Sequence, residues 1–320
     1  MKALVTDHDF PDLELERSII EGAGIELRVA QCKSTDDVIR ESAGCSALLV
    51  LYAPIDERVF CARPEIGLAS RIGAGFDTIN TDDARRHGVW VANSPDYGSS
   101  EVAIHALSLA LSLLRHLPRF DADIKRGVWD ANATGVTRRL ANLAVGVLGY
   151  GRIGGRFAYF AHTMFGRVIA CDPYRIEGDY APYVKPVDMP TLFRESDVIS
   201  IHTPLNDETR GIVGARLLDL MKPGSILVNT ARGAVIDIDA LCARLDKFDG
   251  VGLDVLPIEP VPRDSPLLGA SNVILTPHAA YYTVEAAREL RRKAAQNIVT
   301  WAATGRPDYP VVHGTRKAPD

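Results

Sequence analysis

The chain has 320 residues, of which 47% are hydrophobic and 24% are charged, and it contains 26 glycines and 19 prolines. This composition excludes a disordered, collagen-like or coiled-coil protein and is typical of an α/β protein. A chain of this length favours two domains over a single core. The 36 basic and 41 acidic side chains leave a formal charge of −5, so composition offers no electrostatic reason to expect nucleic acid or an anionic membrane as a partner.

The cysteines and the N-terminus indicate a cytoplasmic protein. The five cysteines form no CxxC pair and most lie in apolar runs, where a free thiol behaves as a small hydrophobic side chain. Asp7 interrupts the first apolar run before a signal peptide could form, and no uninterrupted apolar window of about 18 residues exists. We therefore expect no membrane span and no export.

Short apolar runs alternate with amphipathic runs in the first part of the chain. The pattern predicts strands at residues 3–6, 25–29, 47–51, 69–72 and 89–92, and helices at residues 13–23, 35–42 and 81–87. Such alternation is typical of βαβ units around a parallel sheet. From residue 99 to about residue 126 the apolar spacing becomes helical, and its length predicts one helix that joins two domains.

A second alternating series follows. It predicts strands at residues 144–148, 168–171, 198–201, 226–229, 251–253 and 273–275, and helices at residues 152–165, 191–195, 215–221 and 240–245. This series predicts a complete doubly wound domain at residues 99–283. Residues 284–303 form a further helical pattern before a polar tail, and we expect that helix to complete a first domain made of residues 1–98 and 284–320.

A glycine-rich loop stands between a predicted strand and a predicted helix. Gly149, Gly151 and Gly154 form the pattern G-x-G-x-x-G, which permits a tight turn and a pyrophosphate on the helix N-terminus. The pattern alone also fits an ordinary glycine-rich turn. Asp172, at the end of the next apolar run, is placed to bind ribose hydroxyls and to repel a 2′-phosphate, which favours NAD. Arg175 keeps NADP open as the less favoured cofactor.

Three later segments place a reactive side chain just after a predicted strand. Arg232, Glu259 and His278 suit hydride transfer on a carboxylate-bearing substrate. The arginine can bind a carboxylate or carbonyl, the histidine can exchange a proton, and the glutamate can orient the imidazole. Taken singly, each also fits an interpretation without function: a surface arginine, an exposed loop acid and a buried core histidine.

Several motifs in order give the sequence a family resemblance. They are RIGAGFD at residues 71–77, the glycine loop, HTPL at residues 202–205 with ETR at 208–210, MKPG at 221–224, VNTARG at 228–233 and TPHAA at 276–280. The chain resembles the D-isomer-specific 2-hydroxyacid dehydrogenases, most closely the branch with the C-terminal binding proteins. The resemblance implies a Rossmann NAD-binding domain inserted into a flavodoxin-like substrate domain, and a homodimer with Trp129 near the interface.

The same resemblance implies roles for individual residues. Arg232, Glu259 and His278 are the implied catalytic residues. The implied substrate-binding residues are Tyr52, Arg71, Ala74, Gly75 and Tyr281. The implied cofactor-binding residues are Val102, Gly149, Gly151, Arg152, Ile153, Gly154, Asp172, His202, Thr203, Pro204, Thr209, Thr230, Ala231, Arg232, Asp254, His278 and Ala280.

Departures from the family pattern limit what the resemblance implies. Tyr281 replaces a tryptophan that shapes the pocket of the C-terminal binding proteins, Ile104 replaces a glutamate, and the neighbouring His105 is expected to pack at the domain junction. Ala74 and Glu259 disfavour phosphite and formate oxidation. We expect no metal, because the histidines have no metal-ligand spacing.

The resulting prediction is an NAD-dependent oxidoreductase that interconverts a small 2-oxo acid and its D-2-hydroxy acid. The alternative is an NAD(H)-sensing regulatory protein that acts through a protein partner. The short segments outside the two domains favour the enzyme. The identity of the 2-oxo acid stays open, because Tyr52, Arg71 and Tyr281 indicate only a polar and aromatic pocket.

Overall fold

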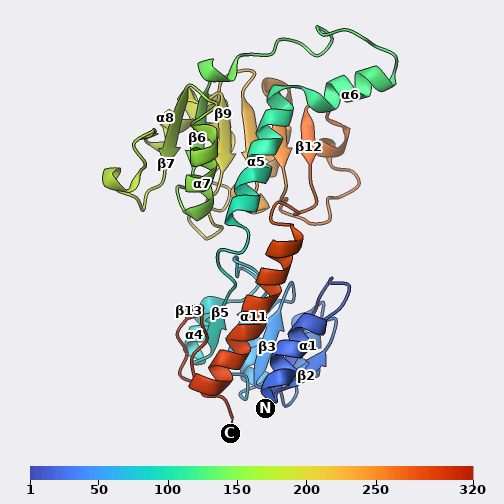
Figure 1. Cartoon of the computed structure of the whole chain (residues 1–320), viewed down its shortest axis with the longest axis vertical. Helices are drawn as coiled ribbons and strands as arrows, with labels where there is room; N and C mark the ends of the chain where they lie inside the picture. The colour runs from blue at the N-terminus through green and yellow to red at the C-terminus, as the bar shows by residue number, and fades with distance from the viewer. Residues whose placement is uncertain (320) are drawn as a thin grey trace. The chain divides into compact units, whose positions relative to one another are not determined.

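The structure, a computed structural model, describes residues 1–319. Its contacts divide the chain into two compact units. Unit 1 is Met1–Tyr97 together with the segment from Thr283 onward, and unit 2 is Gly98–Tyr282. Both units carry a twisted, largely parallel sheet (Figure 1). None of the described helices combines the length and apolar character needed to span a membrane.

Unit 1 is built on a six-stranded sheet. Its strands are β1 (Lys2–Val5), β2 (Glu26–Val29), β3 (Ala47–Val50), β4 (Leu68–Arg71), β5 (Trp90–Ala92) and β13 (Pro310–Val312). Their order is β13-β5-β4-β3-β1-β2, with β13 antiparallel to β5 and the other pairs parallel. The parallel part has the flavodoxin-like order 2-1-3-4-5.

Helices flank the sheet of unit 1. They are α1 (Glu14–Ile20), α2 (Thr35–Glu41), α3 (Glu57–Ala62), α4 (Thr81–Arg86) and α11 (Val284–Thr304). α1 and α11 lie side by side, and α11 packs on β3 and β4 (Figure 1). The buried Trp301 of α11 lies against Gly67, where a Cβ would come within 2.4 Å of the indole ring. The C-terminal segment therefore completes the core of unit 1.

Unit 2 is built on a seven-stranded parallel sheet. Its strands are β6 (Ala144–Leu148), β7 (Arg167–Cys171), β8 (Val184–Pro186), β9 (Val198–Ile201), β10 (Ile226–Asn229), β11 (Gly250–Leu253) and β12 (Val273–Leu275). Their order is β12-β11-β10-β9-β6-β7-β8, a Rossmann order that reverses at β6. Ligands of such sheets bind at the carboxyl ends of the strands next to this reversal.

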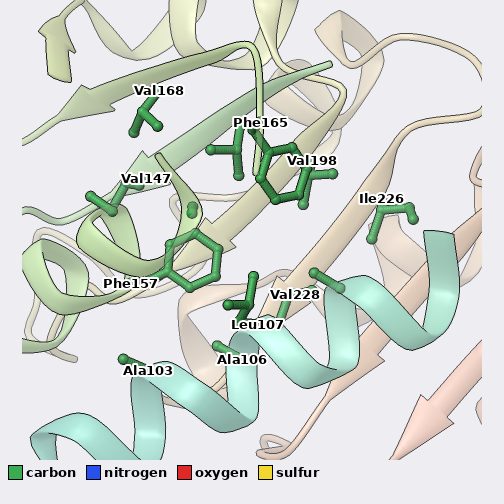
Figure 2. Packing of buried hydrophobic residues seen from close by; sticks show 14 of the residues in the cluster. Ala103, Ala106, Leu107, Val147, Phe157, Phe165, Val168, Val198, Ile226 and Val228 are labelled. Carbon is green, nitrogen blue, oxygen red and sulfur yellow. The ribbon is translucent and has the colours of Figure 1, made fainter. Parts of the chain in front are cut away.

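Six helices accompany this sheet. They are α5 (Ser99–Leu114), α6 (Leu117–Lys125), α7 (Arg152–Ala161), α8 (Met189–Glu195), α9 (Ala215–Leu220) and α10 (Ile238–Cys242). Figure 2 shows Phe157 of α7 between the strands and Ala103 and Ala106 of α5. The small side chains of α5 and the glycines of β11 permit close packing of α5 on the sheet.

The predicted fold class is confirmed, but some predicted elements are wrong. The single helix expected at residues 99–126 is two helices, because His116 adopts a left-handed conformation with φ 51°. Its buried ring lies 3.1 Å from Thr134 Oγ1 and 2.8 Å from Asp249 Oδ2. Pro118 then lies in the first turn of α6, where its missing N–H costs no helical hydrogen bond.

Shorter elements differ as well. The helix predicted at residues 152–165 ends at Ala161, and the sequence pattern did not predict α3, β8 or β13. β8 and β13 each contain a proline, Pro186 and Pro310, which argues against a strand when a sequence pattern is assessed. β13 begins at Pro310, which an edge strand tolerates.

Candidate active site

The glycine-rich loop joins β6 to α7 at the carboxyl edge of the unit 2 sheet. Gly149 has φ 90°, and a Cβ there would lie 2.9 Å from the Thr203 amide nitrogen. A Cβ at Gly154 would lie 2.0 Å from the Gly149 carbonyl oxygen. A Cβ at Gly151 would meet no atom within 4 Å. Two glycines thus close the turn, and the third leaves space over the N-terminus of α7, where Arg152 and Ile153 begin the helix.

Asp172 directly follows β7, and backbone amides hold its side chain. The Tyr150 amide donates to Oδ2 at 2.8 Å, and the Tyr174 amide donates to Oδ1 at 3.0 Å. Tyr150 itself stacks on Tyr180, with ring centroids 4.7 Å apart. The carboxylate is therefore oriented by the loop that would bind the pyrophosphate, as a ribose-binding acid requires.

The predicted adenosine-side residues have partners within the protein. The His202 ring lies against Phe157, and burial lowers its pKa from 6.5 to about 3, so the imidazole is neutral. The Thr203 hydroxyl donates to the Leu148 carbonyl at 3.2 Å. The Thr209 hydroxyl donates to the Pro204 carbonyl at 2.7 Å. These side chains shape the loops after β9 rather than present their polar atoms outward.

The loop after β10 carries Arg232. The buried Asn229 side chain accepts a hydrogen bond from the Ala231 amide at 3.0 Å and donates one to the Arg232 carbonyl at 2.9 Å. A Cβ at Gly233 would lie 1.9 Å from the Leu256 carbonyl carbon. The loop with Arg232 therefore packs directly against the loop that leads to Glu259.

Thr230 offers an observation that bears on a cofactor. Its hydroxyl is buried and has no hydrogen-bond partner among the described residues. A buried polar group without a partner costs free energy, commonly about 1 to 3 kcal/mol, unless a ligand pairs with it. The hydroxyl, the space at Gly151 and the orientation of Asp172 together fit a dinucleotide along this edge of the sheet.

Glu259 and His278 form a hydrogen-bonded pair at the same edge of the sheet. The His278 Nδ1–H donates to Glu259 Oε2 at 2.8 Å, and the Leu256 amide donates to Oε1 at 2.9 Å. Burial would raise the pKa of the Glu259 carboxyl, but these hydrogen bonds and the nearby charge of Arg232 hold it below its ordinary value. The carboxylate stays ionised, which orients the imidazole and leaves Nε2 as its other proton-exchanging atom.

Asp254 holds the turn that carries His278. His278 has φ 54°, a left-handed conformation that is uncommon for residues other than glycine. Its amide donates to the Asp254 carbonyl at 2.8 Å. The amides of Ala279 and Ala280 donate to the two Asp254 carboxylate oxygens, each at 2.9 Å. The buried Asp254 carboxylate therefore holds the backbone turn that orients the His278 side chain.

Four predicted substrate residues lie in unit 1 at the carboxyl ends of β3 and β4. The Tyr52 amide donates to the buried Asp7 carboxylate at 2.6 Å, and the Tyr52 hydroxyl donates to Asp9 at 3.0 Å. Arg71 lies over Gly73, where a Cβ would come within 2.6 Å of Nη1. Ala74 is exposed and Gly75 is half-buried in the next loop.

The remaining predicted residues lie in unit 2. Val102 is in the first turn of α5, and Tyr281 follows the His278 turn with its ring edge-on to Tyr282. The predicted set is thus divided between the two units. Unit 2 brings Arg232, Glu259 and His278 to neighbouring loops.

Sequence reasoning missed two residues that organise this edge. Asn229 ends β10 and holds the Arg232 loop, and an asparagine directly after an apolar run is a recognisable turn signal. Thr276 directly follows β12, and its hydroxyl donates to Asp254 at 2.5 Å. Thr276 stands in the TPHAA motif, but the sequence indicated no role for it, because its partner Asp254 lies on a different loop.

Comparisons with known proteins identify the family of the chain. Residues 107–280 match the family described as D-isomer specific 2-hydroxyacid dehydrogenase, NAD binding domain. The chain is 37% identical over 242 residues to a hydroxypyruvate reductase of Thermotoga maritima, covering 74% of this chain and 78% of that protein. It is 34% identical over 308 residues to a D-3-phosphoglycerate dehydrogenase of Archaeoglobus fulgidus, covering 94% of this chain but only 57% of that protein.

A solved structure is similar over the whole chain. The D-lactate dehydrogenase of Aquifex aeolicus, complexed with NAD and lactic acid, superposes with a TM-score of 0.88 at 26% identity and covers 98% of this chain and 100% of that one. None of these names supports the closer resemblance to the C-terminal binding proteins or the regulatory alternative. The chain belongs to the D-isomer-specific 2-hydroxyacid dehydrogenase family and carries its NAD-binding domain.

Proposed function

We propose that this protein interconverts a small 2-oxo acid and the corresponding D-2-hydroxy acid with NAD, and that Arg232, Glu259 and His278 carry the reaction. The observation that supports this most directly is the hydrogen bond between His278 Nδ1 and Glu259, 2.8 Å long, with Arg232 on the adjoining loop. The family relationship and the names hydroxypyruvate reductase and D-lactate dehydrogenase support the same reaction class.

The residues of unit 2 suit the cofactor and its ribose in particular. Gly149, Gly151 and Gly154 would hold the pyrophosphate, Asp172 would accept hydrogen bonds from the ribose hydroxyls, and the Thr230 hydroxyl would form a hydrogen bond to the cofactor. When bound, the cofactor supplies or accepts the hydride.

The chain's own residues provide binding and proton transfer. Arg232 binds the substrate carboxylate or carbonyl through its planar guanidinium, which gives two parallel hydrogen bonds. His278 donates the Nε2 proton to the carbonyl oxygen during reduction and accepts it during oxidation. Glu259 favours the charged imidazolium that holds this proton, because its pKa is depressed and its carboxylate stays ionised.

The direct test is NADH oxidation with a panel of glyoxylate, hydroxypyruvate, pyruvate and a branched 2-oxo acid. We expect the wild-type protein to reduce at least one of them. His278→Gln should lower kcat by about 10² to 10⁴-fold, the usual contribution of a general acid. Arg232→Lys keeps the charge but not the two parallel hydrogen bonds, whereas Arg232→Ala removes both. The rise in KM for Arg232→Lys measures the two-point binding, and the further rise for Arg232→Ala measures the charge. Unaltered turnover in His278→Gln or Arg232→Ala would contradict the assignment.

We also propose a homodimer in the cytoplasm. Apolar side chains are exposed on α6 and the segment that follows it, including Trp129 at 88% and Val136 at 86% exposure. Exposed apolar side chains gathered on one segment are typical of an interface. Sedimentation of the wild type and of Trp129→Ala tests the dimer: a monomeric wild type would contradict it.

The cytoplasmic location is supported by the cysteines. All five are free thiols, which suits a reducing compartment.

A further inference from the structure

His105 of α5 contacts the residues that hold the His278 turn. Its Nε2 lies 3.0 Å from Thr276 Oγ1 and 3.7 Å from Asp254 Oδ1. The Thr276 hydroxyl in turn lies 2.5 Å from Asp254 Oδ1. We infer that His105 is a positioning residue for His278, acting through Thr276 and the Asp254 carboxylate rather than only packing at a junction. This inference rests on the proposed function of His278.

The protons of this relay follow from the groups present. An ionised carboxylate only accepts hydrogen bonds, and a threonine hydroxyl has a single proton to donate. The short distance assigns that proton to the bond with Asp254. Thr276 Oγ1 is then the acceptor for His105, so His105 Nε2 carries a proton. The relay runs from His105 N–H to the Thr276 hydroxyl and on to Asp254.

Asp254 passes this restraint to the backbone around His278. The Asp254 residue is 2% exposed, and its carboxylate accepts hydrogen bonds from the Thr276 hydroxyl and from the amides of Ala279 and Ala280. The left-handed turn at His278 persists only because its surroundings determine it, since such a conformation costs about 1 to 3 kcal/mol. A carboxylate that has lost one donor can rotate, and the two amides would follow it.

The consequence concerns catalysis more than substrate binding. Arg232 lies on a different loop, which the Asn229 side chain holds through two hydrogen bonds. Loss of the relay should therefore misplace the His278 imidazole while Arg232 keeps its position. A misplacement of about 1 Å costs up to about 10²-fold in rate. The expected signature is a lower kcat with little change in the KM of the 2-oxo acid.

Matched variants of the full-length protein test the relay. Thr276→Val removes the hydroxyl at equal size, whereas Thr276→Ser keeps it; His105→Leu removes the donor, whereas His105→Gln keeps an N–H near Nε2. We expect Thr276→Val and His105→Leu to lower kcat by about tenfold or more and to speed amide exchange in residues 276–282, and the conservative partners to restore both toward wild type. Exchange in residues 144–148 of β6, a central strand of the same unit that lies three strands away from β11, is the control for general destabilisation of unit 2.

Each outcome decides the inference. Wild-type exchange at residues 276–282 in Thr276→Val overturns the relay, and equal kcat for His105→Leu and His105→Gln shows that His105 only packs. If the wild type reduces no 2-oxo acid, the proposed function fails, and exchange alone then decides the relay: faster exchange in Thr276→Val and His105→Leu, but not in their partners, supports it, and any other pattern overturns it.

Discussion

At the scale of single residues, Asp172 links the glycine-rich loop to cofactor choice. Each of its carboxylate oxygens accepts one backbone amide, from Tyr150 and from Tyr174, so the negative charge is fixed at the end of β7. A fixed negative charge can accept hydrogen bonds from ribose hydroxyls and repels a 2′-phosphate. The preference for NAD should therefore reside largely in this side chain.

We predict that Asp172→Asn weakens NADH binding and improves NADPH binding. A hydrogen bond to a charged group contributes about 1.5 to 3 kcal/mol, so the dissociation constant for NADH should rise by about 10 to 100-fold. NADH and NADPH titrations followed by nucleotide fluorescence measure the change. Asp246→Asn removes the same charge from an exposed position near β11 and serves as the control. If Asp172→Asn leaves the ratio of the NADH and NADPH dissociation constants unchanged, this carboxylate does not determine the choice of cofactor.

His202 predicts the acid response of unit 2. Burial lowers its pKa from 6.5 to about 3, so between these values the unfolded chain binds a proton that the folded chain does not. Protonation then favours the unfolded state, and stability declines as the pH falls from 6.5 toward 3. His202→Gln should lack this decline, which amounts to a few kcal/mol at most.

Melting temperatures across this pH range measure the effect. The two proteins are first compared at about pH 8, where imidazole is neutral in both states. As the pH is lowered, the melting temperature of the wild type should fall more than that of His202→Gln. Parallel pH curves for the two proteins would show that His202 does not titrate as its burial implies.

At the scale of elements, most strands could be predicted, whereas the edge strands β8 and β13 and some connections could not. The apolar runs of β6, β9 and β10 are local signals, and placing Glu259 and His278 after β11 and β12 follows from the doubly wound pattern. The break between α5 and α6 depends on His116 meeting Asp249, a residue far along the chain. The turn at His278 likewise depends on Asp254, so no local pattern could reveal its left-handed conformation.

The packing of α5 on β11 gives a prediction at this scale. A Cβ at Gly250 would lie 2.6 Å from Leu113 Cδ2 and 2.9 Å from Leu113 Cβ, so helix and strand would have to separate. Gly250→Ala should therefore destabilise the protein by about 1 to 3 kcal/mol, a drop of several degrees in melting temperature. Gly269→Ala is the matched control, because a Cβ there meets nothing within 4 Å. Equal melting temperatures for the two variants would show that the packing of α5 on β11 does not require glycine at position 250.

At the scale of the whole molecule, the two units differ in how the chain builds them. Unit 2 is one continuous segment, Gly98–Tyr282, and its sheet is enclosed by core clusters drawn from that segment alone. Unit 1 is assembled from both ends of the chain, because α11 packs on α1 and β4 and β13 pairs with β5. The buried Asn297 of α11 also donates to the Asn93 carbonyl after β5.

This difference predicts how fragments of the protein behave. Residues 98–282 expressed alone should fold and bind NADH with an affinity within about tenfold of the full chain, because the glycine-rich loop, Asp172 and Thr230 all lie within them. Residues 1–97 alone should not give a cooperative thermal transition, since Trp301 and the rest of α11 would be missing from their core. The same residues joined through a flexible linker to residues 283–320 should recover it. Thermal melts followed by circular dichroism measure folding, and NADH fluorescence measures cofactor binding. A 98–282 fragment without a cooperative melt would show that unit 2 needs unit 1 to fold. A stable 1–97 fragment would show that unit 1 folds without α11 and β13.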